Sequence, residues 1–163
     1  MITVDELMTE NPYTLRDSNS IHDAWEIMTE HRIRHIPITD DDNHLLGLVT
    51  QRDVLAATKP SSMSTTSDEN SGDGKLSEIM IKNVTTIHKS DNLRQAALHM
   101  QSHKHGCLPV LSEEQLVGII TDSDFVSIAI NLLEQVELLE EQADDESTMD
   151  DVEMPAIDDG DSQ

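Results

Sequence analysis

The sequence contains the same segment twice, and this duplication restricts the possible fold more than any other feature. Residues 6–18, ELMTENPYTLRDS, align with residues 78–90, EIMIKNVTTIHKS. After one residue is lost from a loop, GLVTQRD at 47–53 aligns in the same way with GIITDSD at 118–124. Matches as regular as these indicate two copies of one structural unit. The fold must therefore place two similar units together.

Each copy predicts the element order β-α-β-β-α, preceded by a short opening helix. Short extended segments are expected at 14–15 and 86–87, and amphipathic helices at 21–32 and 93–104. Ser20 and Asn92 are suited to cap the two amphipathic helices. A pair of strands follows in each copy, and a last helix begins at Thr50 or Thr121. One such unit has too small a core to be stable alone, so we expect the two to pack through their sheets.

Changes in composition divide the chain into five parts. We expect a first unit at 3–57, a linker at 58–75, a second unit at 76–130, a helical extension at 131–143 and a tail at 144–163. The linker is rich in Ser, Thr, Asp and Gly, a composition typical of flexible connections. The tail is acidic, has no Lys or Arg and has few apolar residues, which predicts disorder. Whether it binds a partner or only aids solubility is left open by its composition.

Charge and aromatic content exclude some classes of function. The net charge is −23, and Tyr13, Trp25 and Phe125 are the only aromatic residues apart from histidine. A nucleic-acid partner is not expected, because phosphate contacts need clustered cations and unpaired bases need stacking surfaces. Cys107 is the single cysteine, which excludes an internal disulfide. No apolar run is long enough to cross a membrane, so we expect a cytoplasmic protein with no membrane partner.

The repeated GLVTQRD and GIITDSD segments each place Thr and Asp three residues apart at a predicted helix start. Thr50 with Asp53, and Thr121 with Asp124, match an N-cap and a third helical residue, a pairing worth about 0.5–2 kcal/mol to the helix. The same geometry suits a ligand, because a helix N-terminus attracts phosphate and an Asp can accept from ribose hydroxyls. The spacing alone leaves both interpretations open.

Other reactive side chains favour structural roles. His99, His103 and His105 share one helical face, but no cysteine pair or nearby carboxylate completes a metal site there, and no metal is expected. Cys107 precedes Leu-Pro-Val in a predicted strand, so a buried thiol is favoured over a nucleophile. With no nucleophile, metal set or acid–base pair, the chain is not expected to be an enzyme.

The last helix extends beyond what the repeat requires. Its apolar stripe comprises Phe125, Ile128, Ala129, Leu132, Leu133, Val136 and Leu139. The part past Glu134 has no remaining segment of this chain to cover it. This pattern is compatible with a surface that binds a second copy or a partner. It is equally compatible with a frayed helix end.

The two repeated segments resemble the Gly-h-h-(Thr/Ser)-x-x-Asp signature of tandem CBS domains, also called Bateman modules, where h is an apolar residue. ENPYTL, HRIRHIPI and HKHGCLPV are similar to the strand-entry and h-Pro-h segments of that family. The resemblance covers residues 3 to about 130. Within the family, a stand-alone pair is most similar to the acetoin utilization (AcuB) type, some members of which carry a further C-terminal ACT domain.

The resemblance implies an α/β fold in which two β-α-β-β-α CBS units pack as a pseudo-twofold pair with two clefts. It also implies a regulatory, energy-sensing module that binds AMP, ADP, ATP or S-adenosylmethionine, forms a homodimer and signals to a regulated partner protein. A module that has lost its ligand, and acts as a scaffold through dimerisation, its last helix and its acidic tail, is the alternative.

The resemblance also implies which residues meet in each cleft. One cleft would combine Thr50 and Asp53 with Thr85, Gly106, Cys107 and Leu108, and Arg52 beside the first signature could help to bind phosphate. The other cleft would combine Thr121 and Asp124 with Tyr13, Arg34, His35 and Ile36. Family members often carry a basic residue before h-Pro-h to reach phosphate. Arg34 and His35 keep that chemistry, whereas Gly106 and Cys107 do not. Asp122, beside the second signature, is expected to repel phosphate.

Overall fold

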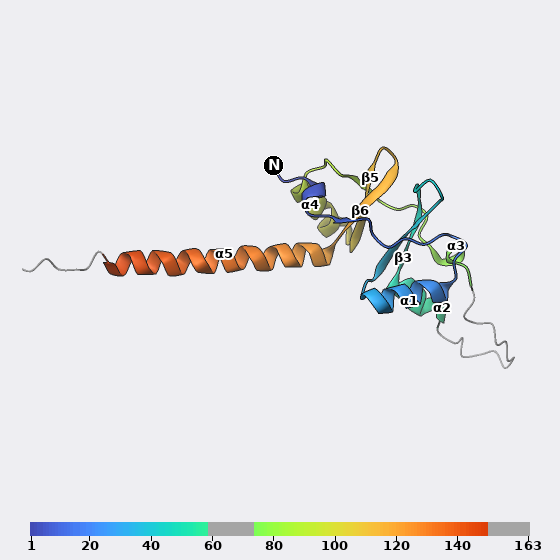
Figure 1. Ribbon diagram of the computed structural model, residues 1–163, viewed down its shortest axis with the longest axis horizontal. Coiled ribbons are helices and arrows are strands. Elements are labelled where there is room, and N and C mark those ends of the chain that lie inside the picture. Colours follow the sequence, from blue (N-terminus) through green and yellow to red (C-terminus); the bar gives the residue numbers. More distant parts are fainter. Residues whose placement is uncertain (59–73, 150–163) are drawn as a thin grey trace, which may run out of the picture. The chain divides into compact units, whose positions relative to one another are not determined.

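The computed structural model describes residues 1–58 and 74–149, which fall into two units, one ending at Asp124 and one beginning at Phe125. The elements follow the duplicated order expected from the sequence (Figure 1). The first copy contributes η1 (Val4–Glu6), β1 (Thr9–Glu10), α1 (Ile21–His31), β2 (His35–Thr39), β3 (Leu45–Thr50) and α2 (Gln51–Thr58). The second contributes α3 (Leu76–Ile79), β4 (Ile87–His88), α4 (Leu93–His103), β5 (Cys107–Ser112), β6 (Gln115–Thr121) and α5 (Asp122–Met149).

Local hydrogen bonds start both amphipathic helices where the sequence predicts. The Asp23 N–H donates to Ser20 Oγ at 3.1 Å, and the Ser20 N–H donates to Asp23 Oδ2 at 2.9 Å, which completes a capping box for α1. The side chain of Asn92 caps α4. Each helix ends at a basic residue in the left-handed conformation, Arg32 with φ of 54° and Lys104 with φ of 57°. The predicted capping residues are therefore confirmed in both copies.

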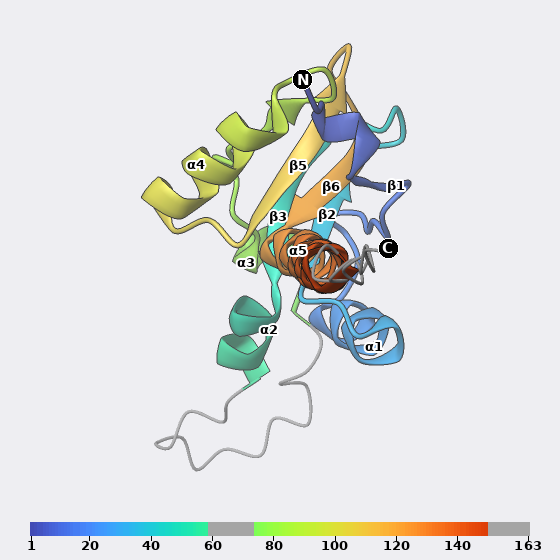
Figure 2. The ribbon, with the colours of Figure 1, turned by 90° about the vertical axis from the view of Figure 1, so that its left-hand side faces the viewer.

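The strands form two antiparallel hairpins of the same design. β2 pairs with β3 in a two-stranded sheet, and the other sheet has the order β1-β6-β5-β4. The register shifts after Ile38 in the first hairpin and after Val110 in the second, so the irregularity is itself repeated. The predicted extended segments run parallel to these strands, as an isolated bridge from Leu15 to Ile38 and as β4 beside β5. α1 and α2 pack together on the first hairpin (Figure 2).

The segment that opens each copy pairs with the strands of the other copy. β1 is antiparallel to β6, with Thr9 opposite Ile119. In the equivalent position, Leu48 and Ile81 exchange two backbone hydrogen bonds of 3.0 and 2.9 Å. Leu76 of α3 is buried in the core of the first copy. The first residues of each expected range, 3–57 and 76–130, therefore pair or pack with the other copy. A pseudo-twofold pair allows this exchange.

The signature glycines lie where these exchanged segments cross the hairpins. A methyl group at Gly47 would lie 2.8 Å from the carbonyl oxygen of Ile81, and one at Gly118 would lie 3.0 Å from that of Thr9. The contact at Gly47 is shorter than real Cβ atoms make, and the one at Gly118 is tighter than most, so glycine favours the close approach of two backbones. Neither glycine has a positive φ, so conformational freedom is not the reason.

Both cores are aliphatic, as the near absence of aromatic residues predicts. The first contains Ile21, Ala24, Met28, Ile36, Ile38, Val49, Val54 and Leu76. Buried residues of the second copy include Leu93, Ala96, Met100, Leu108, Val110 and Ile120. Cys107 is buried against Leu48 and Ile119, and burial raises the pKa of its thiol far above the ordinary value. The expectation of a buried thiol is confirmed.

Two predicted boundaries differ from the structure. Of the expected linker at 58–75, Thr58 ends α2, and Gly74 accepts a hydrogen bond from the Ile21 N–H at 2.8 Å. Residues 144–149 of the expected tail continue α5, whose predicted extension ended at 143. The remaining linker and tail predictions, at 59–73 and 150–163, lie outside the described residues. Within 1–58 and 74–149, no helix combines the length and hydrophobicity needed to cross a membrane.

Candidate functional site

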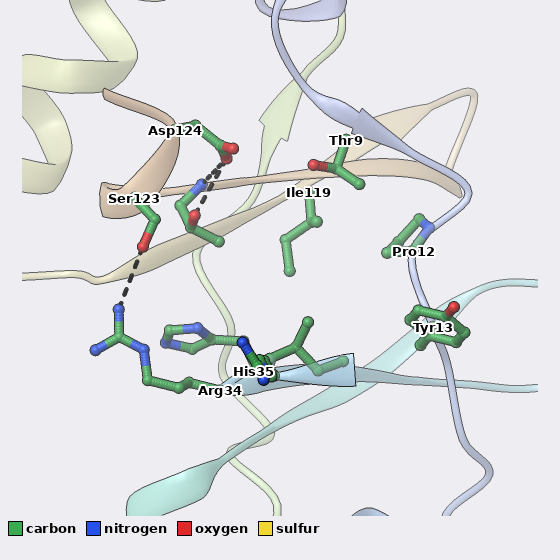
Figure 3. Close-up of a pocket in the computed structure, with 11 residues that line it drawn as sticks. Thr9, Pro12, Tyr13, Arg34, His35, Ile119, Ser123 and Asp124 are labelled. Atoms are coloured by element: carbon green, nitrogen blue, oxygen red, sulfur yellow. Dashed lines mark hydrogen bonds between the residues drawn. The ribbon is translucent and has the colours of Figure 1, made fainter. Parts of the chain in front are cut away.

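A cavity of about 270 Å³ lies between the two copies. It is lined by Thr9, Pro12, Tyr13, Arg32, Ile33, Arg34, His35, Ile119, Thr121, Ser123 and Asp124. Figure 3 shows Asp124 and Thr9 along one side of the cavity, and Arg34 and His35 along the other. The structure therefore brings together Thr121 and Asp124 of the second copy with three predicted residues of the first.

The cap of α5 holds the Asp124 carboxylate at the edge of this cavity. The Thr121 N–H donates to Asp124 Oδ2 at 2.7 Å, and the Thr121 hydroxyl donates to the same oxygen at 3.1 Å (Figure 3). Neither of these bonds uses Oδ1. The carboxylate is thus fixed in position by its own helix start while one oxygen remains outside that cap.

The first copy shows the same cap in a more complete form. The Thr50 N–H and hydroxyl donate to Asp53 Oδ2 at 3.2 and 2.7 Å, and the Asp53 N–H donates back to Thr50 Oγ1 at 3.2 Å. The capping interpretation of the repeated signature therefore holds in full for the first copy, while the second copy shows the half in which the Asp carboxylate accepts from the Thr N–H. It explains why the pattern is present even where Thr50 and Asp53 do not line the cavity.

Arg34 lines the cavity, but its guanidinium already forms an ion pair with Asp122. Its Nη2 lies 3.3 Å from Asp122 Oδ1 and donates to the Ser123 hydroxyl at 3.4 Å. The side chains of Arg34 and Asp122 are each 56% exposed, so solvent weakens this pair and leaves it open to competition. Asp122 would therefore oppose a bound phosphate in two ways. It would repel the phosphate, and it would compete with the phosphate for Arg34.

His35 does not supply the positive charge that the sequence suggested. Burial lowers the pKa of its imidazole, and the charge of Arg34 lowers it further, while Asp122 acts in the opposite direction. The ring is thus neutral at neutral pH and offers a hydrogen bond to a ligand. The change from the expected role follows from tertiary burial, which the neighbouring sequence does not reveal.

The remaining wall of the cavity is apolar and aromatic. Tyr13 stacks on His31, with ring centroids 3.9 Å apart and an interplanar angle of 16°. Ile33, Ile119 and Pro12 add aliphatic surface. Flat surfaces of this kind suit the two faces of a planar ring.

Ile36, which was expected in this site, is fully buried in the core of the first copy and does not line the cavity. The reason is strand alternation. His35 and Ile36 are neighbours in β2, so when the histidine side chain faces the cavity, that of the isoleucine faces the core.

Sequence reasoning missed six lining residues, which are Thr9, Pro12, Arg32, Ile33, Ile119 and Ser123. Thr9 and Ile119 are opposite each other in the pairing of β1 with β6, which joins segments remote in sequence. A sequence signal did exist for Arg32, because it aligns with Lys104, and both copies place a basic residue at the end of the amphipathic helix.

The grouping of the other predicted residues in a second cleft stays a prediction, since those residues lie outside this cavity. The lining of the cavity includes none of the residues Thr50, Arg52, Asp53, Thr85, Gly106, Cys107 and Leu108. Cys107 and Leu108 are buried, and Arg52 is exposed on α2. A methyl group at Gly106 would lie 3.5 Å from His35 Nε2 and 3.7 Å from Asp122 Oδ2. Gly106 is therefore close to His35, which does line the cavity.

The three histidines of the second copy lie together at the end of α4. The rings of His99 and His103 stack with centroids 4.2 Å apart, and His105 lies 5.7 Å from His99. Loss of solvent contact, followed by the charges of the other two rings, lowers the pKa of His99. In the described part of the chain, no three His, Cys, Asp or Glu side chains are arranged to hold a metal ion.

Comparison with known proteins gives matches in both sequence and structure. The chain is 36% identical over 122 residues to a homoserine O-acetyltransferase of Methanocorpusculum labreanum, covering 74% of this chain but only 23% of that relative. A crystal structure described as an acetoin utilization protein (AcuB) of Vibrio cholerae is 47% identical, with a TM-score of 0.72, and the match covers 84% of this chain and 96% of that one.

Two solved structures contain ligands. The CBS domain pair of protein MJ0100, in complex with 5′-methylthioadenosine and S-adenosyl-L-methionine, is 26% identical with a TM-score of 0.68, covering 80% of this chain and 98% of that one. CBSX2 in complex with AMP is 27% identical with a TM-score of 0.67, covering 81% and 98%.

The family model of the CBS domain matches residues 4–59 and 76–131, which are the two copies of the repeat. These two matches take in more than half of the chain, and the folded copies have the element order expected for such a pair. The chain therefore belongs to the CBS domain family, and it carries a tandem pair of these domains.

Proposed function

We propose that this CBS pair is a regulatory module that binds an adenine nucleoside ligand, such as AMP, ADP, ATP or S-adenosylmethionine, in the cavity between its two copies. The observation that carries the proposal is the Asp124 carboxylate, which Thr121 holds at the cavity edge across from Arg34. The adenosine-based ligands of MJ0100 and CBSX2 support the same ligand class.

Each part of such a ligand has a chemical counterpart in the cavity. Asp124 can accept hydrogen bonds from the ribose hydroxyls, and the aliphatic surfaces of Ile33 and Ile119 suit the faces of the adenine ring. Arg32 and Arg34 can pair with a phosphate or a carboxylate. Small-molecule pockets span roughly 300–1,000 Å³, and a cavity of about 270 Å³, slightly below that range, suits one nucleotide better than a dinucleotide.

Regulation would follow from the location of the cavity. Its lining comes from both copies, so an occupant contacts the two halves of the pair at once. A ligand changes a conformational equilibrium only by binding one state more tightly than another. We propose that occupancy favours one arrangement of the two copies, and that a homodimer of this chain presents that arrangement to a regulated protein.

Isothermal titration calorimetry with AMP, ATP and S-adenosylmethionine tests the proposal, with GMP as the control for base identity. Saturable binding of at least one adenine compound, with weaker binding of GMP, is the expected result. If circular dichroism shows a folded chain and none of the adenine compounds binds, the proposal is wrong. That result would favour the ligand-free scaffold, for which the existing pairing of Arg34 with Asp122 provides a specific reason.

The charge of the ligand can be tested at Asp122. Asp122→Asn should strengthen binding of AMP or ATP by about two- to fivefold, because a surface ion pair that competes for Arg34 is worth up to about 1 kcal/mol. S-adenosylmethionine carries a sulfonium and an ammonium cation beside its single carboxylate, so its binding should gain less. Titration calorimetry with each ligand provides the measurement.

Asp42→Asn is the matched control, because Asp42 is exposed and is not among the residues that line the cavity. It makes the same change in net charge at a distance from the proposed ligand. An equal gain in nucleotide affinity for both variants would show a general charge effect and would contradict the role assigned to Asp122.

A further inference from the structure

The second unit presents an apolar helix face without a partner in the described part of that unit. All its described residues, 125–149, belong to α5. Leu132 is 56% exposed, Val136 is 50% exposed and Leu139 is 65% exposed. A long helix whose large aliphatic side chains are exposed is stabilised by covering them, because packing of an apolar face provides most of the stability of helices in proteins.

These side chains follow the repeat of a coiled coil. Successive spacings of four and three residues connect Phe125, Ala129, Leu132, Val136, Leu139 and Ala143. This is the a/d pattern of a heptad, with Val136 at a β-branched a position and Leu132 and Leu139 at d positions. We define these six residues as the seam. A seam of this kind is covered by another helix with the same repeat.

The positions of the charges indicate which helix that is. Most acidic residues in this part of α5 lie on the outer positions of the heptad, and they are Glu134, Glu137, Glu141, Asp144 and Asp145. The positions that flank the seam are Val126, Ile128, Leu133, Gln135, Glu140 and Gln142, of which only Glu140 is charged. Flanking charges select coiled-coil partners. A basic partner helix would be matched by acidic flanks, whereas mostly uncharged flanks allow a second acidic copy to approach.

We propose that α5 pairs with α5 of a second copy of this chain as a parallel, in-register coiled coil. The distribution of apolar residues decides the direction. The first half of the seam has apolar neighbours such as Ile128 and Leu133, whereas Glu146 interrupts the repeat after Ala143. A parallel pair places apolar half against apolar half, while an antiparallel pair would place it against the acidic end. The proposal does not depend on a ligand in the CBS pair.

Disulfide trapping tests the direction and the face together. In a parallel pair, two Leu139→Cys side chains meet across the seam, at the Cα separation of about 5.5–6 Å that a disulfide prefers. Leu138→Cys is the matched control, because Leu138 is 57% exposed on the same helix but lies outside the seam. The wild-type chain, whose Cys107 is buried, is the blank.

Under mild oxidation of the full chain, Leu139→Cys should form the covalent dimer about tenfold faster than Leu138→Cys, because geometry controls disulfide formation. Equal rates, or a faster rate for Leu138→Cys, would overturn the proposal. Dimerisation through a helix face centred on Leu138 would reverse this difference, because neighbouring residues of a helix point about 100° apart.

Sedimentation equilibrium supplies a second readout. Leu139→Glu should raise the dimer dissociation constant about tenfold or more, since it buries a charge in the seam, while Leu138→Glu should change it by less than about twofold. Leu and Glu have similar helix propensities, and circular dichroism should show α5 intact in both variants. If the two variants associate equally, the seam is not the contact between copies.

Discussion

Asp124→Asn is expected to weaken binding of an adenine nucleoside ligand by roughly 10- to 100-fold, because hydrogen bonds to a charged group contribute about 1.5–3 kcal/mol. The substitution is designed to spare the fold. The amide oxygen of Asn can still accept from the N–H and hydroxyl of Thr121, which now donate to Asp124 Oδ2 at 2.7 and 3.1 Å. What is lost is the negative charge that two ribose hydroxyls would share. Titration calorimetry with the ligand that binds most tightly gives the affinity.

Asp53→Asn is the internal control for this prediction. Asp53 makes the same type of cap with Thr50 in the first copy, but it does not line the cavity. Both variants should lose a similar, small amount of unfolding free energy in urea, and only Asp124→Asn should lose affinity. Unchanged affinity in Asp124→Asn would remove Asp124 from the ligand site. An equal loss in both variants would instead indicate a second site at Thr50 and Asp53.

Gly47→Ala should lower the free energy of unfolding by about 1–3 kcal/mol, the usual cost of adding a methyl group where there is no space. The new Cβ would lie 2.8 Å from the carbonyl oxygen of Ile81 and 2.8 Å from Met80 Sδ. A methionine side chain can move away, but the carbonyl belongs to a backbone that is hydrogen-bonded to Leu48 on both sides. The contact must therefore be relieved by separating the two copies. Urea denaturation followed by circular dichroism measures the loss.

Gly106→Ala provides the comparison, because its new Cβ would meet nothing closer than His35 Nε2 at 3.5 Å, an ordinary contact. Its φ is also not positive, so alanine adds no backbone strain. We expect a change within about 0.5 kcal/mol, as for most substitutions without a specific structural effect. If Gly47→Ala were equally harmless, the close crossing of Ile81 and β3 would not be the reason for glycine in the signature.

The most accurate sequence predictions concern hydrogen bonds between residues close in the chain. Ser20, Asn92 and Thr50 cap helices as predicted, since each cap needs only the residues that follow it. The end of α5 was placed six residues too early because an acidic composition predicted disorder. Glu, Gln and Ala are good helix formers, and this local preference is compatible with a helix that continues to Met149.

Properties that depend on distant contacts could not be predicted in the same way. The two-residue strand β1 has no sequence pattern of its own, and its pairing with β6 joins residues from opposite ends of the CBS pair. The engagement of Arg34 by Asp122 also follows from a contact between copies, and the lowered pKa of His35 follows mainly from its burial in the folded chain. Ile36 was misplaced because β2 turns its side chain into the core.

The sequence by itself determined the duplication, the helix starts and the membership of a family of paired domains, because repeated local patterns encode all three. Only the tertiary structure decided which signature reaches the cavity. Thr121 with Asp124 does so, whereas Thr50 with Asp53 remains a helix cap outside it. The physical reason is that a cap is made within four residues, while a cavity is enclosed by segments from both copies whose exchange and packing no single segment contains.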